Sequence, residues 1–344
     1  MFRSAAIACL ALLAASPAWA QAQAPSDLFD GQALRVILCG TSGPLPDPGR
    51  AKSCTLIIAG DEAYVVDTGP ESWEQIARMG IPGTRISGIF LTHFHSDHIG
   101  DLGEFRMQTM VAGRNQKLKV FGPKGIKSVV DGFNQAYRED ARHRLAHHGA
   151  DIINLKAADL EARPIAAGFR GELNAEEVVF EKDGLKVTAF EVDHDPVRPA
   201  VGYRFDWKGR SAVVTGDTAL ASNLTENARK ADVLVSDTLA ANMIGQAQKA
   251  AASGGNARNA KILADIPDYH LSPAEAAKTA NDAGVGLLVF SHLVPSAQAR
   301  SPLFLADVED IRPGSGWVLG FDGLRIDLPT GGEEIRQSAL LPKP

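Results

Sequence analysis

The sequence predicts an α/β protein of the α+β kind, built as a four-layer αβ/βα sandwich of two packed sheets between outer helices. Short runs rich in Val, Ile and Leu recur along the chain and are bounded by Gly, Pro and Asp turns. These runs gather in two halves, and each half also contains segments with helical spacing. Strand-rich halves that carry helices favour two sheets packed face to face.

The first half opens with a β meander and continues with helices around a buried strand. We expect strands at residues 34–39, 54–59, 63–67 and 88–91, and helices at 71–79, 102–111 and 124–140. Residues 141–175 show no clear period and are expected to be rich in loops.

The second half repeats the pattern. We expect strands at residues 178–180, 185–192, 200–207, 211–215, 232–236 and 286–290, and helices at 219–229, 238–251 and 273–283. The runs 316–321 and 324–328 predict a closing hairpin around Asp322 and Gly323. The Gly-, Ala- and Asn-rich stretch 245–262 is interpreted as a mobile loop.

The N-terminal residues 1–20 have the pattern of a signal peptide. Arg3 precedes an apolar run over residues 5–15, and Ala18-Trp19-Ala20 forms a small-x-small cleavage pattern. The apolar run is shorter than the roughly 20 residues that a membrane-spanning helix needs. We therefore expect a periplasmic or secreted protein without a membrane span, in which residues 21–344 form one domain. Cleavage at Ala22 or Ala24 and an uncleaved anchor are the alternatives.

Charge and size narrow the class of partner. The formal net charge is −6, and no stretch of the sequence clusters Lys and Arg as a long polyanion would require. We therefore expect a small-molecule substrate and no long nucleic acid. The sequence leaves open whether the chain acts alone or as a homodimer.

Two cysteines remain once Cys9 is removed with the signal peptide. Cys39 and Cys54 lie at the edges of neighbouring strand-like runs, in a compartment that permits disulfides. A cross-link is geometrically accessible there, and two separate buried thiols fit the sequence equally well.

The densest group of chemically active side chains is the segment Leu-Thr-His-Phe-His-Ser-Asp-His-Ile-Gly at residues 91–100. It places His93, His95, Asp97 and His98 directly after a buried strand. Neutral imidazole nitrogens and a carboxylate are ligands for a divalent cation. Without a cation, these polar groups would crowd the end of a hydrophobic strand with few partners. The segment therefore predicts a metal site.

On this segment the sequence resembles the metallo-β-lactamase superfamily, whose signature is His-x-His-x-Asp-His after a strand. Further motifs of that superfamily match in order: Asp67 after a strand, His194, Gly-Asp at Asp217, and His292. Each of these later motifs is weak alone. Their common order and their position after hydrophobic strands strengthen the resemblance, which spans about residues 34–328.

The resemblance implies a dinuclear centre and its ligands. His93, His95 and His194 would hold the first metal ion, and Asp97, His98 and His292 the second. Asp217 would bridge the two ions, and Asp67 would support the loop. Zinc suits this mixture of nitrogen and oxygen ligands best, and manganese and iron also fit. Two such cations polarise water and stabilise charge on the attacked centre, and Asp97 would also orient the water.

Within the superfamily the sequence resembles ribonuclease Z and its arylsulfatase-like relatives. The features are the turn at residues 39–43, the stretch 194–204, the bridging aspartate and His270. Related enzymes pair that histidine with an acid in a His-Glu-Ala-Thr-like segment, which here reads Ser-Asp-Thr. Asp237 and His270 therefore form either a catalytic dyad or a structural polar pair.

Two departures argue against precursor tRNA as the substrate. Ribonuclease Z commonly carries a basic arm between its third and fourth motifs, where only 22 residues lie here. Export also conflicts with an intracellular process. We therefore expect an exported zinc hydrolase of a small phosphodiester or sulfate ester; the alternatives are a β-lactamase or lactonase and a non-catalytic metal-binding protein. His143, His147 and His148 are interpreted as a solvated helix end, with substrate contact as the alternative.

Overall fold

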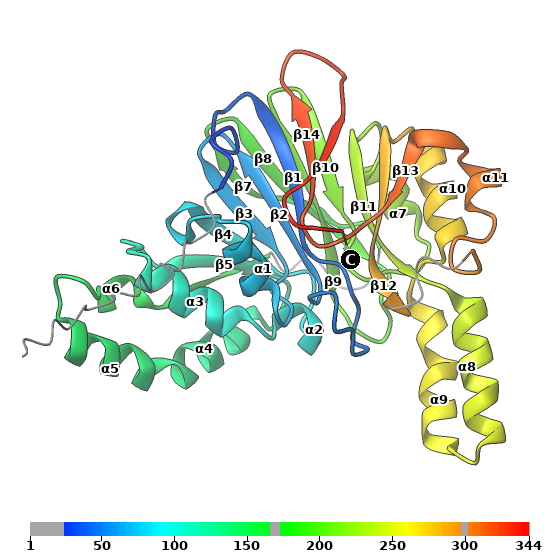
Figure 1. The fold of residues 1–344 in the computed structure, drawn as a ribbon, viewed down its shortest axis with the longest axis horizontal. Helices are drawn as coiled ribbons and strands as arrows, with labels where there is room; N and C mark the ends of the chain where they lie inside the picture. Colours follow the sequence, from blue (N-terminus) through cyan, green and yellow to red (C-terminus); the bar gives the residue numbers. More distant parts are fainter. Residues whose placement is uncertain (1–23, 166–172, 297–301, 344) are drawn as a thin grey trace, which may run out of the picture.

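Two β-sheets form the centre of the molecule (Figure 1). The computed structural model describes residues 24–165, 173–296 and 302–343. The first sheet contains β1 (Ala33–Gly40), β2 (Cys54–Ala59), β3 (Glu62–Val66), β4 (Ile86–Phe90), β5 (Leu118–Gly122), β6 (Leu160–Pro164), β14 (Leu324–Pro329) and β15 (Arg336–Ala339). Its strand order is β15-β14-β1-β2-β3-β4-β5-β6, so β6 is an edge strand.

The second sheet contains β7 (Glu176–Lys182), β8 (Leu185–Val192), β9 (Ala200–Trp207), β10 (Arg210–Val214), β11 (Val233–Leu239), β12 (Leu287–Val294) and β13 (Trp317–Leu319). Its order is β13-β12-β11-β10-β9-β8-β7. The helices of the described residues are α1 (Ser72–Arg78), α2 (Ser96–Ile99), α3 (Leu102–Val111), α4 (Ile126–Ala136), α5 (Arg138–His148), α6 (Leu155–Ala158), α7 (Ser222–Asn227), α8 (Ala241–Ser253), α9 (Ala257–Asp265), α10 (Pro273–Ala283) and α11 (Val308–Ile311), with 3-10 turns η1 (Gly83–Arg85), η2 (Ile266–Tyr269) and η4 (Gly314–Gly316).

Alternation along each strand builds three apolar layers. In β1, Val36 and Leu38 belong to the core between the sheets, whereas Ile37 and Cys39 pack in the layer outside the first sheet. Successive side chains of a strand point to opposite faces, so a strand buried on both sides is apolar throughout. Helices α1, α3 and α4 lie over the first sheet, and α7 and α10 over the second (Figure 1). The predicted four-layer sandwich is confirmed.

Parallel pairing brings the functional segments to one edge. Strands β3 to β6 pair in parallel, as do β10 to β13. The carboxyl ends of parallel strands lie at the same edge of a sheet, where ligands of open α/β sheets usually bind. Helix α2, which follows β4, lies below the strands of the first sheet in Figure 1, and its Asp97 carboxylate lies 3.2 Å from His292 Nε2 of β12.

Three predicted elements in the helical regions differ from the structure. The predicted helix 124–140 is divided into α4 and α5 at Tyr137, whose backbone leaves the helical region, and the expected loop 141–175 contains the rest of α5, then α6 and β6. The expected mobile loop 245–262 lies within the helical hairpin α8–α9, which projects from the body (Figure 1). Alanines favour this helix, and Gly254 and Gly255 form its turn.

The closing hairpin is also wrong. Strand β13 pairs in parallel with β12 of the second sheet, whereas β14 pairs with β1 of the first. The Asp322 carboxylate accepts hydrogen bonds from Thr41 Oγ1 at 2.7 Å and from the Ala51 amide at 2.6 Å. The residues between the two strands therefore carry the chain from one sheet to the other.

Cys39 and Cys54 form a disulfide between β1 and β2, with their Cα atoms 4.9 Å apart. The structure therefore selects the cross-link over two separate thiols. Among the described residues, no helix has the length and apolar character that crossing a membrane requires. The predicted signal peptide lies outside the described residues, and export stays a prediction.

Candidate metal centre

The loop after β4 is held from beneath by Asp67, which follows β3. Asp67 accepts hydrogen bonds from the Thr92 amide at 2.8 Å and from Thr92 Oγ1 at 2.9 Å. Its Oδ2 also lies 2.8 Å from His98 Nδ1. Asp67 adopts a φ of 61°, a left-handed backbone conformation that Asp tolerates better than most residues. One buried carboxylate thus fixes both the start and the end of the histidine segment.

Three histidines have Nδ1 within hydrogen-bond distance of an oxygen atom of the protein. His93 Nδ1 lies 3.1 Å from Thr92 Oγ1, which donates its own proton to Asp67. His98 Nδ1 donates to Asp67, and His194 Nδ1 donates to the Tyr269 carbonyl at 3.0 Å. A proton on Nδ1 leaves Nε2 with a free lone pair, which is how metal-binding histidines are usually oriented.

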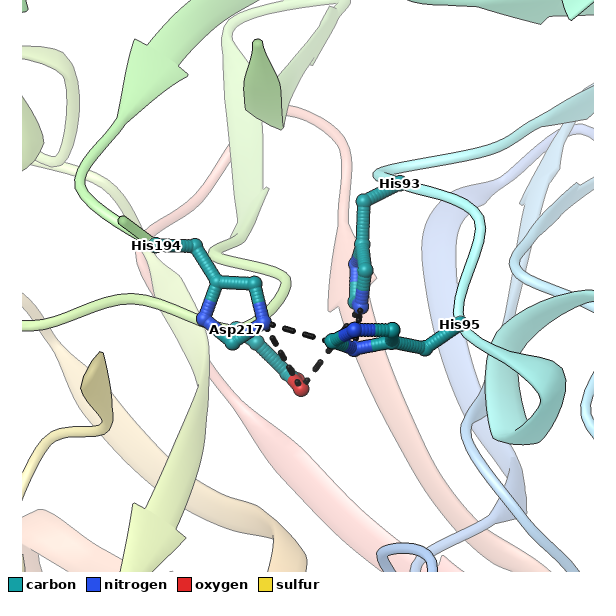
Figure 2. A group of neighbouring side chains, drawn as sticks. All are labelled: His93, His95, His194 and Asp217. Atoms are coloured by element: carbon teal, nitrogen blue, oxygen red, sulfur yellow. Dashed lines mark hydrogen bonds and ion pairs between the residues drawn. The ribbon is translucent and has the colours of Figure 1, made fainter. Parts of the chain in front are cut away.

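Asp217 lies at the centre of the site. Its Oδ2 is 3.3 Å from His98 Nε2 and 3.4 Å from His292 Nε2. The same oxygen is 3.9 Å from the Nε2 atoms of both His93 and His194. Figure 2 shows Asp217 pointing into the space where His93, His95 and His194 converge. One carboxylate therefore faces ring nitrogens from both halves of the chain.

The structure brings together all seven residues that the sequence singles out. His93, His95, His194 and Asp217 form one group whose ligand atoms lie within 4.8 Å of one another. Asp97, His98 and His292 form a second such group, and His292 Nε2 lies 3.2 Å from Asp97 Oδ2. His95 is the one exposed member of the first group, so the site opens to solvent on that side.

Two properties of these seven side chains suit metal binding: some of their buried polar atoms lack hydrogen-bond partners, and their pKa values respond to the charges of the site. His98 Nε2, Asp217 Oδ1 and His292 Nδ1 are buried, and no hydrogen-bond partner occurs for them among the described residues. Burial lowers the pKa of His93 well below its usual value and that of His194 to about 4, despite the opposing charge of Asp217. Burial would raise the pKa of Asp97, but the charges of His98 and His292 hold it at about 2. Burial acts to lower the pKa of His98 and His292, but the charge of Asp217 raises both above the usual value. The site therefore attracts positive charge at these two positions. Ionised carboxylates and neutral imidazoles are the forms that bind cations, and metal binding releases the protons of such imidazoles.

A dyad lies beside this cluster. His270 Nδ1 lies 2.7 Å from Asp237 Oδ2, both side chains are buried, and Asp217 Oδ2 is 4.0 Å from the same His270 nitrogen. Burial raises the pKa of Asp237 to about 6, although the hydrogen bond from His270 acts in the opposite direction. Asp237, His270, Asp217 and His292 are close enough to form a third ligand group.

Tyr269 is a contributor that sequence reasoning missed. Its backbone carbonyl fixes His194, and its ring lies edge-on to that imidazole with centroids 4.8 Å apart. A backbone contact leaves no residue-type signal in a sequence. In contrast, His143, His147 and His148 are exposed on α5 and belong to none of the groups that could hold a metal among the described residues.

Comparison with known proteins identifies the family. Residues 63–293 match the model of the β-lactamase superfamily domain. Ribonuclease Z of Mycobacterium bovis (strain BCG / Pasteur 1173P2) is 35% identical over 266 residues, which cover 76% of this chain and 87% of the relative. The chain belongs to the β-lactamase superfamily, in its ribonuclease Z branch.

Other members of the branch agree in sequence and in fold. Ribonuclease Z of Mycobacterium tuberculosis (strain ATCC 25618 / H37Rv) is 34% identical over 263 residues, covering 76% of this chain and 86% of the relative. The crystal structure of the short form of human tRNase Z matches 86% of this chain and 99% of its own, with a TM-score of 0.60 and 19% identity. Like other members of its family, the chain is a metal-dependent hydrolase, and its clustered His and Asp residues form a dinuclear type of metal site.

These relatives overturn two expectations. The small ester-like substrate and the exclusion of a long nucleic acid are wrong, because the relatives are ribonucleases by name and one is a tRNase. The argument from charge failed because a net value of −6 does not describe any single face of the molecule. The argument from the missing arm tested only residues 194–217, which form the β9–β10 hairpin, whereas the helical projections lie elsewhere in the chain.

Proposed function

We propose that this chain is a ribonuclease that hydrolyses an RNA phosphodiester bond, with precursor tRNA as the first substrate to test. The observation that carries the proposal is the position of Asp217 Oδ2, within 3.9 Å of ring nitrogens of His93, His98, His194 and His292. One carboxylate shared by two histidine groups is suited to a pair of cations. The ribonuclease Z relatives support RNA as the substrate class.

In this proposal two Zn²⁺ ions occupy the centre. His93, His95 and His194 would hold the first, Asp97, His98 and His292 would hold the second, and the Asp217 carboxylate, which faces both groups, would be available to either ion. Such cations supply a hydroxide at neutral pH and stabilise the negative charge that develops on the attacked phosphate. Mixed imidazole and carboxylate ligands favour zinc, and the metal content of the purified chain decides its identity.

The chain's own residues supply orientation and proton transfer. The Asp97 carboxylate, ionised over the whole neutral range, accepts a hydrogen bond from the attacking water and orients it. The bond from phosphorus to the leaving oxygen then breaks. His270, oriented by Asp237, donates a proton to that oxygen and recovers one from solvent.

The proposal is tested with the chain purified without its first 20 residues and loaded with zinc. We expect about two zinc ions per chain and cleavage of a labelled precursor tRNA at one position, with loss of both after chelation and recovery after zinc is returned. A parallel assay with a chromogenic cephalosporin controls for lactam hydrolysis. Zinc-loaded protein that leaves every RNA intact would overturn the proposed function.

A further inference from the structure

The described residues contain a large hollow away from the metal centre. It encloses about 840 Å³ and lies between α4, the start of α5 and the edge strand β6. Its lining carries five basic and three acidic residues, an excess of two positive charges: Arg106, Lys117, Lys127, Arg138 and Arg142 against Asp131, Asp159 and Glu161. Because the whole chain carries −6, this groove is positive against the average of the molecule. A positive groove attracts a polyanion.

The groove begins at the sheet edge that carries the metal centre. Pro164, at the carboxyl end of β6, lines the groove and pairs with Gly122 of β5. The neighbouring Phe121 carbonyl accepts the Leu91 amide at 2.8 Å, two residues before His93. Two strand spacings, about 10 Å, therefore separate Pro164 from Leu91, which directly precedes the histidine loop.

Helix α4 also links the groove to the histidine loop, on the side of the groove opposite β6. It begins after Gly125, which packs against the Phe94 ring. A Cβ atom added at Gly125 would lie 3.1 Å from that ring. Phe94 stands between His93 and His95. Lys127 comes two residues after Gly125, and the 11 residues of α4 extend the groove for about 16 Å from there.

The basic side chains of the groove are accessible to a ligand. Lys127, Arg138 and Arg142 have side-chain exposures of 76%, 57% and 60%. Lys127 pairs with Asp131, and both arginines pair with Glu139. Exposed pairs of this kind contribute about 0–1 kcal/mol, so a phosphate can replace or share the carboxylate partner. Arg106 differs, because it is buried against Asp159 and serves the structure.

We infer that this groove, defined by Lys127, Arg138 and Arg142, holds the phosphates of the RNA chain on one side of the cleaved bond. This inference rests on the proposed function, and it specifies which surface of the molecule binds the RNA chain. A neighbouring hollow shares Lys117 with the groove and adds Lys119 and Lys182, of which Lys182 is paired with Glu62. The contacts are to phosphate, so they provide affinity without reading base sequence.

Two pairs elsewhere in the chain provide a matched control. Lys278 and Asp282 on α10 form an i,i+4 pair like Lys127 and Asp131, with side-chain exposures of 63% and 51%. Arg229 and Glu226 form an i,i+3 pair like Arg142 and Glu139. Helix α10 lies at the opposite end of the molecule from α4 and α5 (Figure 1).

The experiment compares Lys127→Gln/Arg142→Gln with Lys278→Gln/Arg229→Gln in the full zinc-loaded protein. The readouts are KM and kcat for a precursor tRNA over a range of salt concentrations, with zinc content and thermal midpoint as checks of folding. Each lost phosphate contact should flatten the plot of log(1/KM) against log[salt] by about 0.7–0.9. The groove variant should therefore lose about 1.4–1.8 in slope and at least tenfold in affinity at low salt, with kcat unchanged.

The control variant should keep the wild-type KM and slope. RNA cleavage with the same KM and slope in both variants would overturn the groove while leaving the proposed function standing. A zinc-loaded wild type that cleaves no RNA would instead remove the proposed function, and the groove with it.

Discussion

Asp237 accepts a 2.7 Å hydrogen bond from His270 although the two residues are 33 positions apart in the chain. The whole hairpin α8–α9 is inserted between them. Both side chains are buried, and the His270 nitrogen that binds Asp237 also lies 4.0 Å from Asp217 Oδ2. The dyad is therefore placed to act on the same reacting group as the metal centre.

The first prediction separates proton transfer from metal binding. His270→Ala should keep two metal ions per chain and lower kcat for RNA by about 10²- to 10⁴-fold, because a positioned acid is removed while all seven proposed ligands remain. Metal analysis and single-turnover cleavage measure the two effects. Full activity in this variant would show that the pair is structural.

The second prediction concerns pH. Because the pKa of Asp237 is raised to about 6, this carboxylate takes up a proton as the pH falls through 6 and loses the charge that orients His270. The pKa of Asp97 is about 2 and that of His194 about 4, so neither changes charge between pH 5 and 7. We expect kcat to fall below pH 6 in the wild type and to lose this dependence in Asp237→Asn. If kcat of the variant still falls below pH 6 as in the wild type, another titrating group causes the decrease.

The third prediction tests the central carboxylate. Asp217→Ala should bind fewer than two metal ions and lose at least 10³-fold in kcat, since Asp217 Oδ2 lies within 3.9 Å of histidine nitrogens of both ligand groups. Asp195→Asn is the control, because Asp195 follows the proposed ligand His194 but is exposed and paired with Arg198. Metal content that stays at two per chain in Asp217→Ala would contradict a shared ligand.

The fourth prediction concerns the support beneath the ligands. Asp67→Asn keeps the side-chain size and tolerates the left-handed backbone, but it loses the anion that accepts hydrogen bonds from Thr92 and His98. Zinc affinity should fall by about 10- to 100-fold, as is usual when such a partner of a ligand is removed. Competition with a chromogenic chelator measures it, and an unchanged zinc affinity would show that packing alone holds the loop.

The fifth prediction concerns the cross-link between β1 and β2. Cys39 and Cys54 close a loop of about 15 residues, so replacing both with Ser should lower the free energy of unfolding by about 3 kcal/mol. Equilibrium unfolding in denaturant measures the change. Wild-type protein that releases two free thiols when unfolded without a reductant would contradict the disulfide.

Export is tested separately at the N-terminus. If residues 1–20 are a signal peptide, the mature chain begins at Gln21, or after Ala22 or Ala24. N-terminal sequencing of the protein from the periplasm or the medium decides this. A chain that begins at Met1 would reject cleavage.

The metal cluster could be predicted from the sequence because His93, His95, Asp97 and His98 lie within six positions. Residues this close in the sequence remain close in space in the folded chain, whatever the rest of the fold. The β13–β14 connection could not be predicted, since Asp322-Gly323 between two strands reads as a hairpin until the partners of each strand are known. Tyr269 escaped notice because its carbonyl, common to every residue, makes the contact.

The expectation that excluded a long nucleic acid was wrong for a different reason. A sum over 41 acidic and 35 basic residues hides where they lie, and the positive groove appears only when α4 and β6 are placed side by side. The helix predicted at 238–251 corresponds to α8, whereas α9 was missed because Gly and Asn near the turn of the hairpin α8–α9 outweighed the helix-forming residues that follow them.

The attachment of that hairpin has a practical consequence. Its base is tied to the body by backbone hydrogen bonds from Leu239 to Leu271 and from Ala240 to Val294, whereas Gly254 and Gly255 form a turn at its exposed tip. We expect a fluorescent label or a short peptide insert at this tip to leave the reaction untouched. A label at this position would report binding of a candidate substrate without a change at the metal centre.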